Sequence, residues 1–204
     1  MITGIEGGMS QGKTLVMTYF ALSEYKDCGK RLIANYTLLQ IPYERVTFGD
    51  LVGWSAVCKQ CQWREGAYVC GFCGGRGFDN EALLLDEVHI LADSRASQSK
   101  TNKVFSYLVT QTSKQDVNLY YTTQDFGMVD KRLRQQTHIG THVRLKGDQH
   151  HLVIDDRTSE RRRPKRAWIY GPAVYEFYKT RERIKQNDTE AALKALKKRN
   201  ASLT

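Results

Sequence analysis

The sequence predicts an α/β fold in which a mostly parallel β-sheet is flanked by helices, and two observations near its start carry that prediction. Residues 1–6 can form a short strand, and GGMSQGKT (7–14) follows as a glycine-containing loop. LVMTYFALSEYKDCGK (15–30) then has apolar residues at helical spacing, with Gly29 placed to end the helix. RLIANYTL (31–38) can form the next strand, and this order makes a βαβ unit with parallel strands.

The later part of the chain contains three more segments with strand or helix patterns. EALLLDEVHI (81–90) is an apolar run that ends in two carboxylates, which is typical of a buried central strand, and VNLYYTTQD (117–125) predicts another. KVFSYLVTQTSK (103–114) between them has a helical pattern. These segments would extend the same sheet and add a helix to it.

The C-terminal region, residues 150–204, predicts a basic β-hairpin followed by basic helices. HHLVIDD (150–156) and KRAWIYG (165–171) can pair across RTSERRRP, with Trp168, Tyr170 and Tyr175 expected in the core. The final segments, at 173–185 and 189–200, have helical and basic patterns. At 204 residues and 41% hydrophobic content, residues 1–204 suit one domain with its own core.

The loop GGMSQGKT matches the phosphate-binding pattern G-x-x-x-x-G-K-[ST]. Its glycines allow successive backbone N–H groups to point at a phosphate, and the following helix adds the positive end of its dipole. Lys13 would reach the β- and γ-phosphates of ATP, and the Thr14 hydroxyl would bind Mg²⁺. The predicted nucleotide-binding residues are Gly7, Gly8, Met9, Ser10, Gln11, Gly12, Lys13 and Thr14.

The carboxylate pair Asp86 and Glu87 ends the apolar run and supplies what such a loop requires. Asp86 fits a second Mg²⁺ ligand delivered by a neighbouring strand, and Glu87 fits a general base that polarises the attacking water. An ATPase needs a base of this kind, whereas a kinase that phosphorylates a small molecule does not. The pair therefore favours ATP hydrolysis.

The ordered set of loop, DE pair and TTQ strand end resembles the FtsK/HerA branch of P-loop ATPases, which have a RecA/FtsK-like fold. Ser94-Arg95 after the acidic pair and Val129-Asp130-x-x-Leu133-Arg134 after the glutamine also resemble the Zot-type assembly ATPases of filamentous phages. Within this group, the chain is most similar to the genome-packaging NTPases of archaeal turreted icosahedral viruses. The resemblance spans about residues 1–145.

The resemblance implies further catalytic residues and partners. Gln124 would sense the γ-phosphate and the attacking water, and an arginine from a neighbouring subunit, with Arg95 and Arg134 as candidates, would stabilise the transferring phosphoryl group. Active sites would therefore lie between the subunits of a homo-oligomeric ring, a hexamer or a pentamer. The implied partners are double-stranded DNA and a capsid or vertex protein.

Four cysteines, in the pattern C-x2-C-x8-C-x2-C, predict a zinc-ribbon-like insertion at residues 55–78. Two such knuckles can place four thiolates around one tetrahedral, structural Zn²⁺, and two disulfides are the alternative. The ligands would be Cys58, Cys61, Cys70 and Cys73.

The net charge of +9 is concentrated in the last quarter of the chain. Residues 1–156 contain 17 Lys and Arg and 17 Asp and Glu, whereas residues 157–204 contain 14 and 5. Such a segment suits a polyanion such as nucleic acid, and a solvated basic tail is the alternative. The predicted DNA contacts, at the tip of the hairpin, are Arg161, Arg162, Arg163, Lys165 and Arg166.

The sequence has no apolar run of about 18 residues and no basic-then-apolar leader, so we expect no membrane association. The leading prediction is an ATP-driven motor that translocates double-stranded DNA during viral genome packaging, in the host cytoplasm or on the virion. Two rivals are a P-loop kinase for a small molecule and a zinc-containing DNA-binding or scaffold protein that does not hydrolyse its nucleotide.

Overall fold

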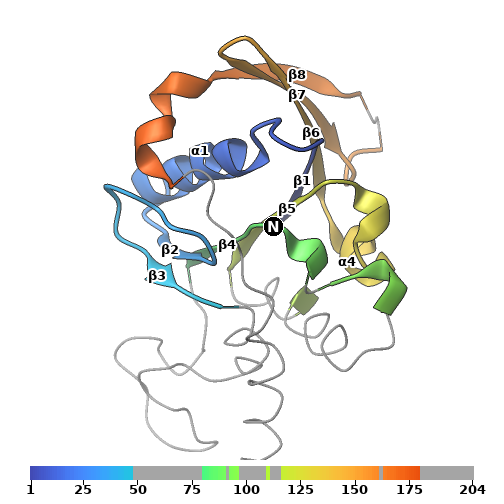
Figure 1. Cartoon of the computed structure of the whole chain (residues 1–204). Helices are drawn as coiled ribbons and strands as arrows, with labels where there is room; N and C mark the ends of the chain where they lie inside the picture. The colour runs from blue at the N-terminus through green and yellow to red at the C-terminus, as the bar shows by residue number, and fades with distance from the viewer. Residues whose placement is uncertain (48–79, 91, 97–108, 111–115, 161–162, 180–204) are drawn as a thin grey trace, which may run out of the picture.

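Eight β-strands form one mixed sheet in the computed structural model, which describes residues 1–47, 80–90, 92–96, 109–110, 116–160 and 163–179 (Figure 1). The order across the sheet is β3-β2-β4-β5-β1-β6-β7-β8. Neighbouring strands from β3 to β6 are parallel, and β6, β7 and β8 are antiparallel. The strands are β1 (Ile2–Glu6), β2 (Arg31–Ala34), β3 (Glu44–Arg45), β4 (Glu81–Leu85), β5 (Asn118–Thr123), β6 (Ile139–Lys146), β7 (Gln149–Asp156) and β8 (Lys165–Tyr170).

Helices α1 (Lys13–Lys26) and α4 (Lys131–Gln136) bury apolar residues against the sheet in two separate clusters. Leu84 of β4 packs in the cluster that contains Leu15 of α1. Its neighbours in the strand, Leu83 and Leu85, pack in the cluster that contains Leu133 of α4. Since successive strand residues point to opposite faces, a central strand buried on both faces must be apolar throughout, as the run EALLL is.

The predicted mostly parallel α/β sheet is therefore confirmed, and its layout places the candidate site. Strands β4, β5 and β1 are adjacent and parallel, so their carboxyl ends lie along the same edge of the sheet. The loop 7–12 follows β1, and Asp86 and Gln124 each come directly after their strands. Ligands of open α/β sheets bind at this edge.

The strand predicted over residues 31–38 ends at Ala34. The side chain of Asn35 turns toward the segment after β4, and Leu38 forms an isolated antiparallel bridge with Tyr178. That bridge also explains why the helix predicted from residue 173 is absent over 173–179. Tyr178 packs in the α1 cluster, the Leu39 N–H donates to the Phe177 carbonyl (2.8 Å), and short 3-10 helices replace the α-helix.

Three aromatic residues expected in the core are instead exposed. Trp168, Tyr170 and Tyr175 have 61%, 51% and 46% of their surface accessible. The first two lie on β8 and alternate with the buried Ile169, which packs in the α1 cluster. Ile169 is the one buried residue of β8, and the side of the strand opposite to it presents large aromatic groups to solvent.

Several sequence-based predictions lie outside the described residues. The cysteine insertion at 55–78, the final helix at 189–200, and Arg161 and Arg162 are among them. From the helix predicted at 103–114, the structure describes residues 109–110, and both are helical. Across the described ranges, no helix is long and apolar enough to cross a membrane.

Candidate nucleotide-binding site

The glycine loop connects β1 to α1, and its backbone conformation requires glycine at two positions. Gly12 has a φ of +85°, and a Cβ there would overlap the imidazole ring of His150. A Cβ at Gly7 would lie 2.8 Å from the carbonyl oxygen of Val143 in β6. The loop thus rests directly on β6 and β7, and the spacing of its glycines is set by this close approach.

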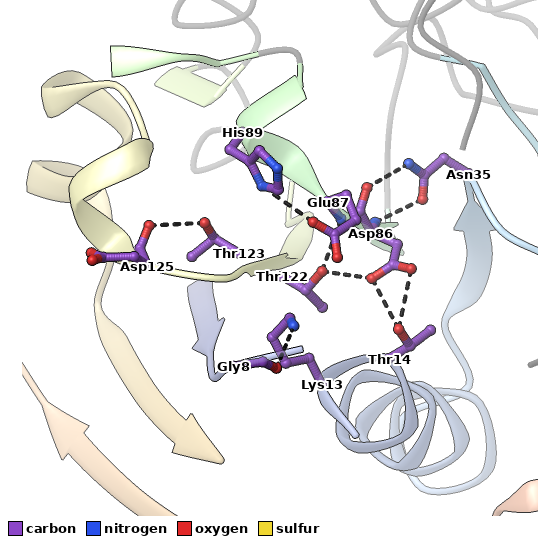
Figure 2. A network of polar contacts seen from close by, with 10 residues as sticks. All are labelled: Gly8, Lys13, Thr14, Asn35, Asp86, Glu87, His89, Thr122, Thr123 and Asp125. Carbon is purple, nitrogen blue, oxygen red and sulfur yellow. Dashed lines mark hydrogen bonds and ion pairs between the residues drawn. The ribbon is translucent and has the colours of Figure 1, made fainter. Parts of the chain in front are cut away.

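Lys13 and Thr14, the first residues of α1, both point toward the carboxyl edge of the sheet (Figure 2). The Lys13 side chain is 6% exposed, and its Nζ donates a hydrogen bond to the Gly8 carbonyl oxygen at 3.0 Å. The Thr14 hydroxyl lies 3.1 Å from each carboxylate oxygen of Asp86. Two residues 72 positions apart in the sequence are thereby brought together, as the nucleotide and magnesium prediction requires.

Asp86 is held rigidly from two sides, by its backbone and by its carboxylate. Its N–H donates to the Asn35 side-chain oxygen (2.7 Å), and its carbonyl accepts from the Asn35 amide (2.9 Å). Its carboxylate accepts a hydrogen bond from the Thr122 hydroxyl at 2.6 Å. Burial raises the pKa of Asp86 to about 6, although the bonds from Thr122 and Thr14 oppose this shift. Among the described residues, the nearby charge of Lys13 offsets this cost of burial only in part.

Glu87 has a positive φ of 54°, so the backbone leaves the extended conformation of β4 at this residue. Its N–H donates to the Thr122 hydroxyl at 2.8 Å, so one threonine bonds to both acidic residues. The Glu87 carboxylate oxygen Oε2 lies 3.3 Å from Nδ1 of His89, close enough for an ion pair when His89 is protonated (Figure 2). Within the described part of the chain, neither atom has a hydrogen-bond partner.

Gln124 follows β5 at the same edge of the sheet and is exposed. The residues around it are fixed, because the Thr123 hydroxyl donates to the Asp125 carbonyl (2.9 Å) and the Asp125 carboxylate accepts from the Gly127 N–H. An exposed side chain at this edge of the sheet is free to contact a bound nucleotide. Its role as a γ-phosphate sensor stays a prediction.

The two candidate arginines differ in their surroundings. Arg95 has an 84% exposed side chain and forms an ion pair with Asp93 at 3.1 Å. Arg134 lies in α4 and is half-buried, with its Nε lacking a hydrogen-bond partner among the described residues. The segments that carry them are adjacent, because Asp93 and Val129 form a β-bridge and the Asp130 N–H donates to the Ala92 carbonyl.

The predicted zinc and DNA contacts are described only in part. The four cysteines of the predicted zinc site fall outside the described residues, and the residues that are described contain no group of three or more His, Cys, Asp or Glu that could hold a metal ion. Arg163, Lys165 and Arg166 are exposed. Lys165 and Arg166 begin β8, and β8 pairs with β7 in antiparallel register.

Asn35 and His150 are site residues that the sequence analysis missed. His150 is buried in β7, and its Nδ1 lies 3.0 Å from the Gln11 carbonyl oxygen. Since a carbonyl oxygen can only accept, Nδ1 carries the proton. The Gln11 side chain in turn accepts from the Leu145 N–H of β6 at 2.8 Å. The loop is therefore bonded to β6 and β7, and no short-range pattern in the sequence announces contacts across 134 or more positions.

A glycine loop between a strand and a helix, with a lysine and a threonine facing an acidic strand end, defines a P-loop NTPase fold. No protein-family model and no curated protein matches the sequence. The comparison with solved structures finds similar domains that carry this fold, and three of them are described next.

The N-terminal domain of zonular occludens toxin from Neisseria meningitidis superimposes with a TM-score of 0.56 at 16% identity, covering 87% of this chain and 98% of that one. The genome-packaging NTPase B204 of Sulfolobus turreted icosahedral virus 2, in complex with ATP-gammaS, gives a TM-score of 0.53 at 13% identity, with 81% and 95% covered. The DNA-packaging ATPase B204 of Sulfolobus turreted icosahedral virus gives 0.52 at 15%, again with 81% and 95% covered. At these identities the likeness concerns the fold.

Proposed function

We propose that this protein is an ATP-hydrolysing motor that translocates double-stranded DNA and loads a viral genome into a preformed capsid. The observation that carries the proposal is the contact of Thr14 with both oxygens of Asp86, with Glu87 as the next residue. This arrangement supports the assignment of Thr14 and Asp86 as magnesium ligands directly beside a candidate base. The fold is shared with a genome-packaging NTPase whose structure contains an ATP analogue.

The residues at the edge of the sheet fit Mg²⁺ and ATP. Mg²⁺ takes oxygen ligands, and the Thr14 hydroxyl and the Asp86 carboxylate supply them 3.1 Å apart. When bound, the ion would neutralise charge on the phosphate groups. Burial raises the pKa of Asp86, and a bound cation would offset the cost of keeping this carboxylate charged, so the donor set and its electrostatics agree.

The chain's own groups account for the remaining parts of hydrolysis. Lys13 would release the Gly8 carbonyl and bind the β- and γ-phosphate oxygens through Nζ. Glu87 would orient a water molecule and accept its proton, and His89 would hold the Glu87 carboxylate in place beforehand. Gln124 would hold the same water from the neighbouring strand, and Arg95 or Arg134 of an adjacent subunit would complete the site.

The motor function rests on partners as well as on chemistry. A ring of identical subunits, a hexamer or a pentamer, would enclose DNA, and exposed basic groups such as Arg163, Lys165 and Arg166 would contact its phosphates. We expect the protein in the host cytoplasm and at the capsid vertex, where it would meet a capsid or vertex protein. The four cysteines would hold a structural Zn²⁺.

Phosphate release from ATP, measured with and without DNA, tests the proposal against its rivals. We expect the Glu87→Gln variant to bind nucleotide normally and to lose about 10²- to 10⁴-fold in hydrolysis, because a positioned base contributes that factor. Glu176→Gln is the matched control, since Glu176 is an exposed carboxylate that accepts a hydrogen bond from the Gln40 side chain. Hydrolysis by the Glu87 variant at the rate of the unmodified protein would exclude Glu87 as the base.

The same assay separates a motor from the other two classes. A small-molecule kinase would hydrolyse ATP slowly and gain nothing from DNA. A non-hydrolysing scaffold would bind both ligands without turnover. A motor should hydrolyse ATP faster when DNA is present, so basal turnover without stimulation by any DNA would count against translocation.

A further inference from the structure

Strands β6, β7 and β8 form an antiparallel unit with one buried side and one open side. Val143, Leu152 and Ile169 point to the buried side and pack in the α1 cluster. The strand register aligns the alternate residues of the open side in rows across the three strands. We call this open side the outer face; the row beside the β6–β7 turn is Lys146, Gln149 and Tyr170, and the row after it is Arg144, His151 and Trp168.

The outer face is exposed and cationic. All six residues of the two rows are exposed, and so is Arg166, which pairs with Val153 in the next row. Arg144 donates from Nε to His142 at 3.2 Å, which keeps its guanidinium on this side of the sheet. None of the three rows contains Asp or Glu within β6, β7 and β8, whereas Glu6 of β1 continues the row of His142 and Asp155 lies in the row after it, paired with Gly140. The surface therefore has the charge of a polyanion-binding site.

Two large aromatic side chains stand among these cations. Trp168 and Tyr170 are two positions apart on β8, so their side chains leave the same face about 7 Å apart. Each is more than half exposed. Two exposed aromatic side chains side by side on a sheet face that also carries Arg and Lys suit stacking against planar bases.

We propose that the outer face binds single-stranded DNA, with Trp168 and Tyr170 stacked on unpaired bases and Arg144 and Lys146 on the phosphates. A duplex presents its phosphates to such a surface but encloses the faces of its bases, so it would leave both aromatic groups unused. The proposed motor function supplies the choice of DNA as the polyanion. The outer face would bind an unpaired stretch of DNA, distinct from the duplex that the motor is proposed to translocate.

Fluorescence anisotropy with a labelled oligothymidylate of about 20 nucleotides tests this in the full-length protein without ATP, since single-strand sites span about 4–16 nucleotides per domain. The double variant Trp168→Leu, Tyr170→Leu should bind at least about tenfold more weakly, because stacking contributes that much per base. Trp168→Phe should restore most of the affinity lost at that position. Tyr19→Leu is the matched control, since Tyr19 is an exposed aromatic residue of α1.

The salt dependence tests the cations separately from the aromatic groups. The variant Arg144→Gln, Lys146→Gln should reduce the slope of log affinity against log salt by about 0.7 for each lost phosphate contact. Lys26→Gln, Lys131→Gln removes the same charge from exposed positions on the helices and should leave the slope unchanged. Hydrolysis of ATP without DNA should be the same in all of these variants.

Three outcomes would overturn the proposal. One is an aromatic double variant that binds oligothymidylate as tightly as the unmodified protein does. Another is a double variant that loses as much affinity for a blunt duplex as for oligothymidylate. A third is a change in oligomeric state with DNA binding intact, which would make the outer face an interface between copies of the chain. None of these touches the Glu87→Gln result, so the motor proposal and the outer-face proposal can fail independently.

Discussion

Replacing Asp86 by asparagine should stabilise the protein in the absence of magnesium, although it removes a predicted metal ligand. The carboxylate is buried, and burial raises its pKa from 3.8 to about 6. Asparagine preserves the shape and can accept the hydrogen bond from Thr122 while donating its amide to the Thr14 hydroxyl. The substitution therefore removes a buried charge and retains the bonds around it.

The size and pH dependence of the effect follow from the two pKa values. Because the folded state holds its proton up to about pH 6 and the unfolded state releases it near 3.8, stability falls as the pH rises between these values. At neutral pH the difference corresponds to an upper value of about 3 kcal/mol. The Asp86→Asn variant has no titrating carboxyl at this position. Its gain in free energy of unfolding over the unmodified protein should therefore be near zero below pH 4 and should reach its full size above pH 6.

Urea unfolding in EDTA, at steps from pH 4 to pH 7, measures this advantage directly. Mg²⁺ with nucleotide should stabilise the unmodified protein and leave the variant unchanged. Asp156→Asn is a suitable control, because hydrogen bonds from Thr158 lower the pKa of that exposed carboxyl and its loss should bring no gain. A variant that is less stable at pH 7, or a difference that is constant with pH, would refute the reasoning.

Three further changes test other contacts. Asn35→Ala should lower the free energy of unfolding by about 2 kcal/mol or more, because it leaves a buried N–H and a buried carbonyl unpaired; an unchanged urea midpoint would contradict this. Gly12→Ala should abolish nucleotide binding, measured with a fluorescent ATP analogue, since a methyl group there meets His150 at a positive φ; normal affinity would show that the loop can move aside. Metal analysis should find one zinc per chain, lost when Cys58 and Cys61 are changed to serine, and four oxidised sulfurs in its place would favour disulfides.

The parts of the fold that the sequence predicts are those that local patterns encode. Apolar runs such as EALLL specify strands buried on both faces, and GGMSQGKT specifies a strand-to-helix turn. Parallel strands then bring their carboxyl ends together, so the contact between Thr14 and Asp86 follows from topology once the strand order is known. The adjacency of β4, β5 and β1 is therefore the step that converts separate motifs into one site.

The missed features depend on pairings between distant segments. The sequence predicts Asn35 as an ordinary strand residue. In the structure its side-chain amide forms two hydrogen bonds with the backbone of Asp86, and β2 ends one residue earlier, at Ala34. Residues 173–179 have a helical pattern, but Tyr178 contributes more by packing beside α1 and bridging Leu38. Trp168 was expected inside because it is large and apolar, whereas its alternation with Ile169 in β8 already indicates the opposite side.

The hydrogen bonds of Gln11 with Leu145 and His150 join the phosphate loop to β6 and β7. A nucleotide that reorganises the loop must therefore work against the same two strands whose other side is the outer face. Thermodynamic reciprocity then applies: if ATP changes the affinity for a strand bound there by some factor, the strand changes the affinity for ATP by that same factor. Coupling of this kind would pass through β6 and β7, which bond to the loop and also carry Arg144, Lys146 and His151 of the outer face.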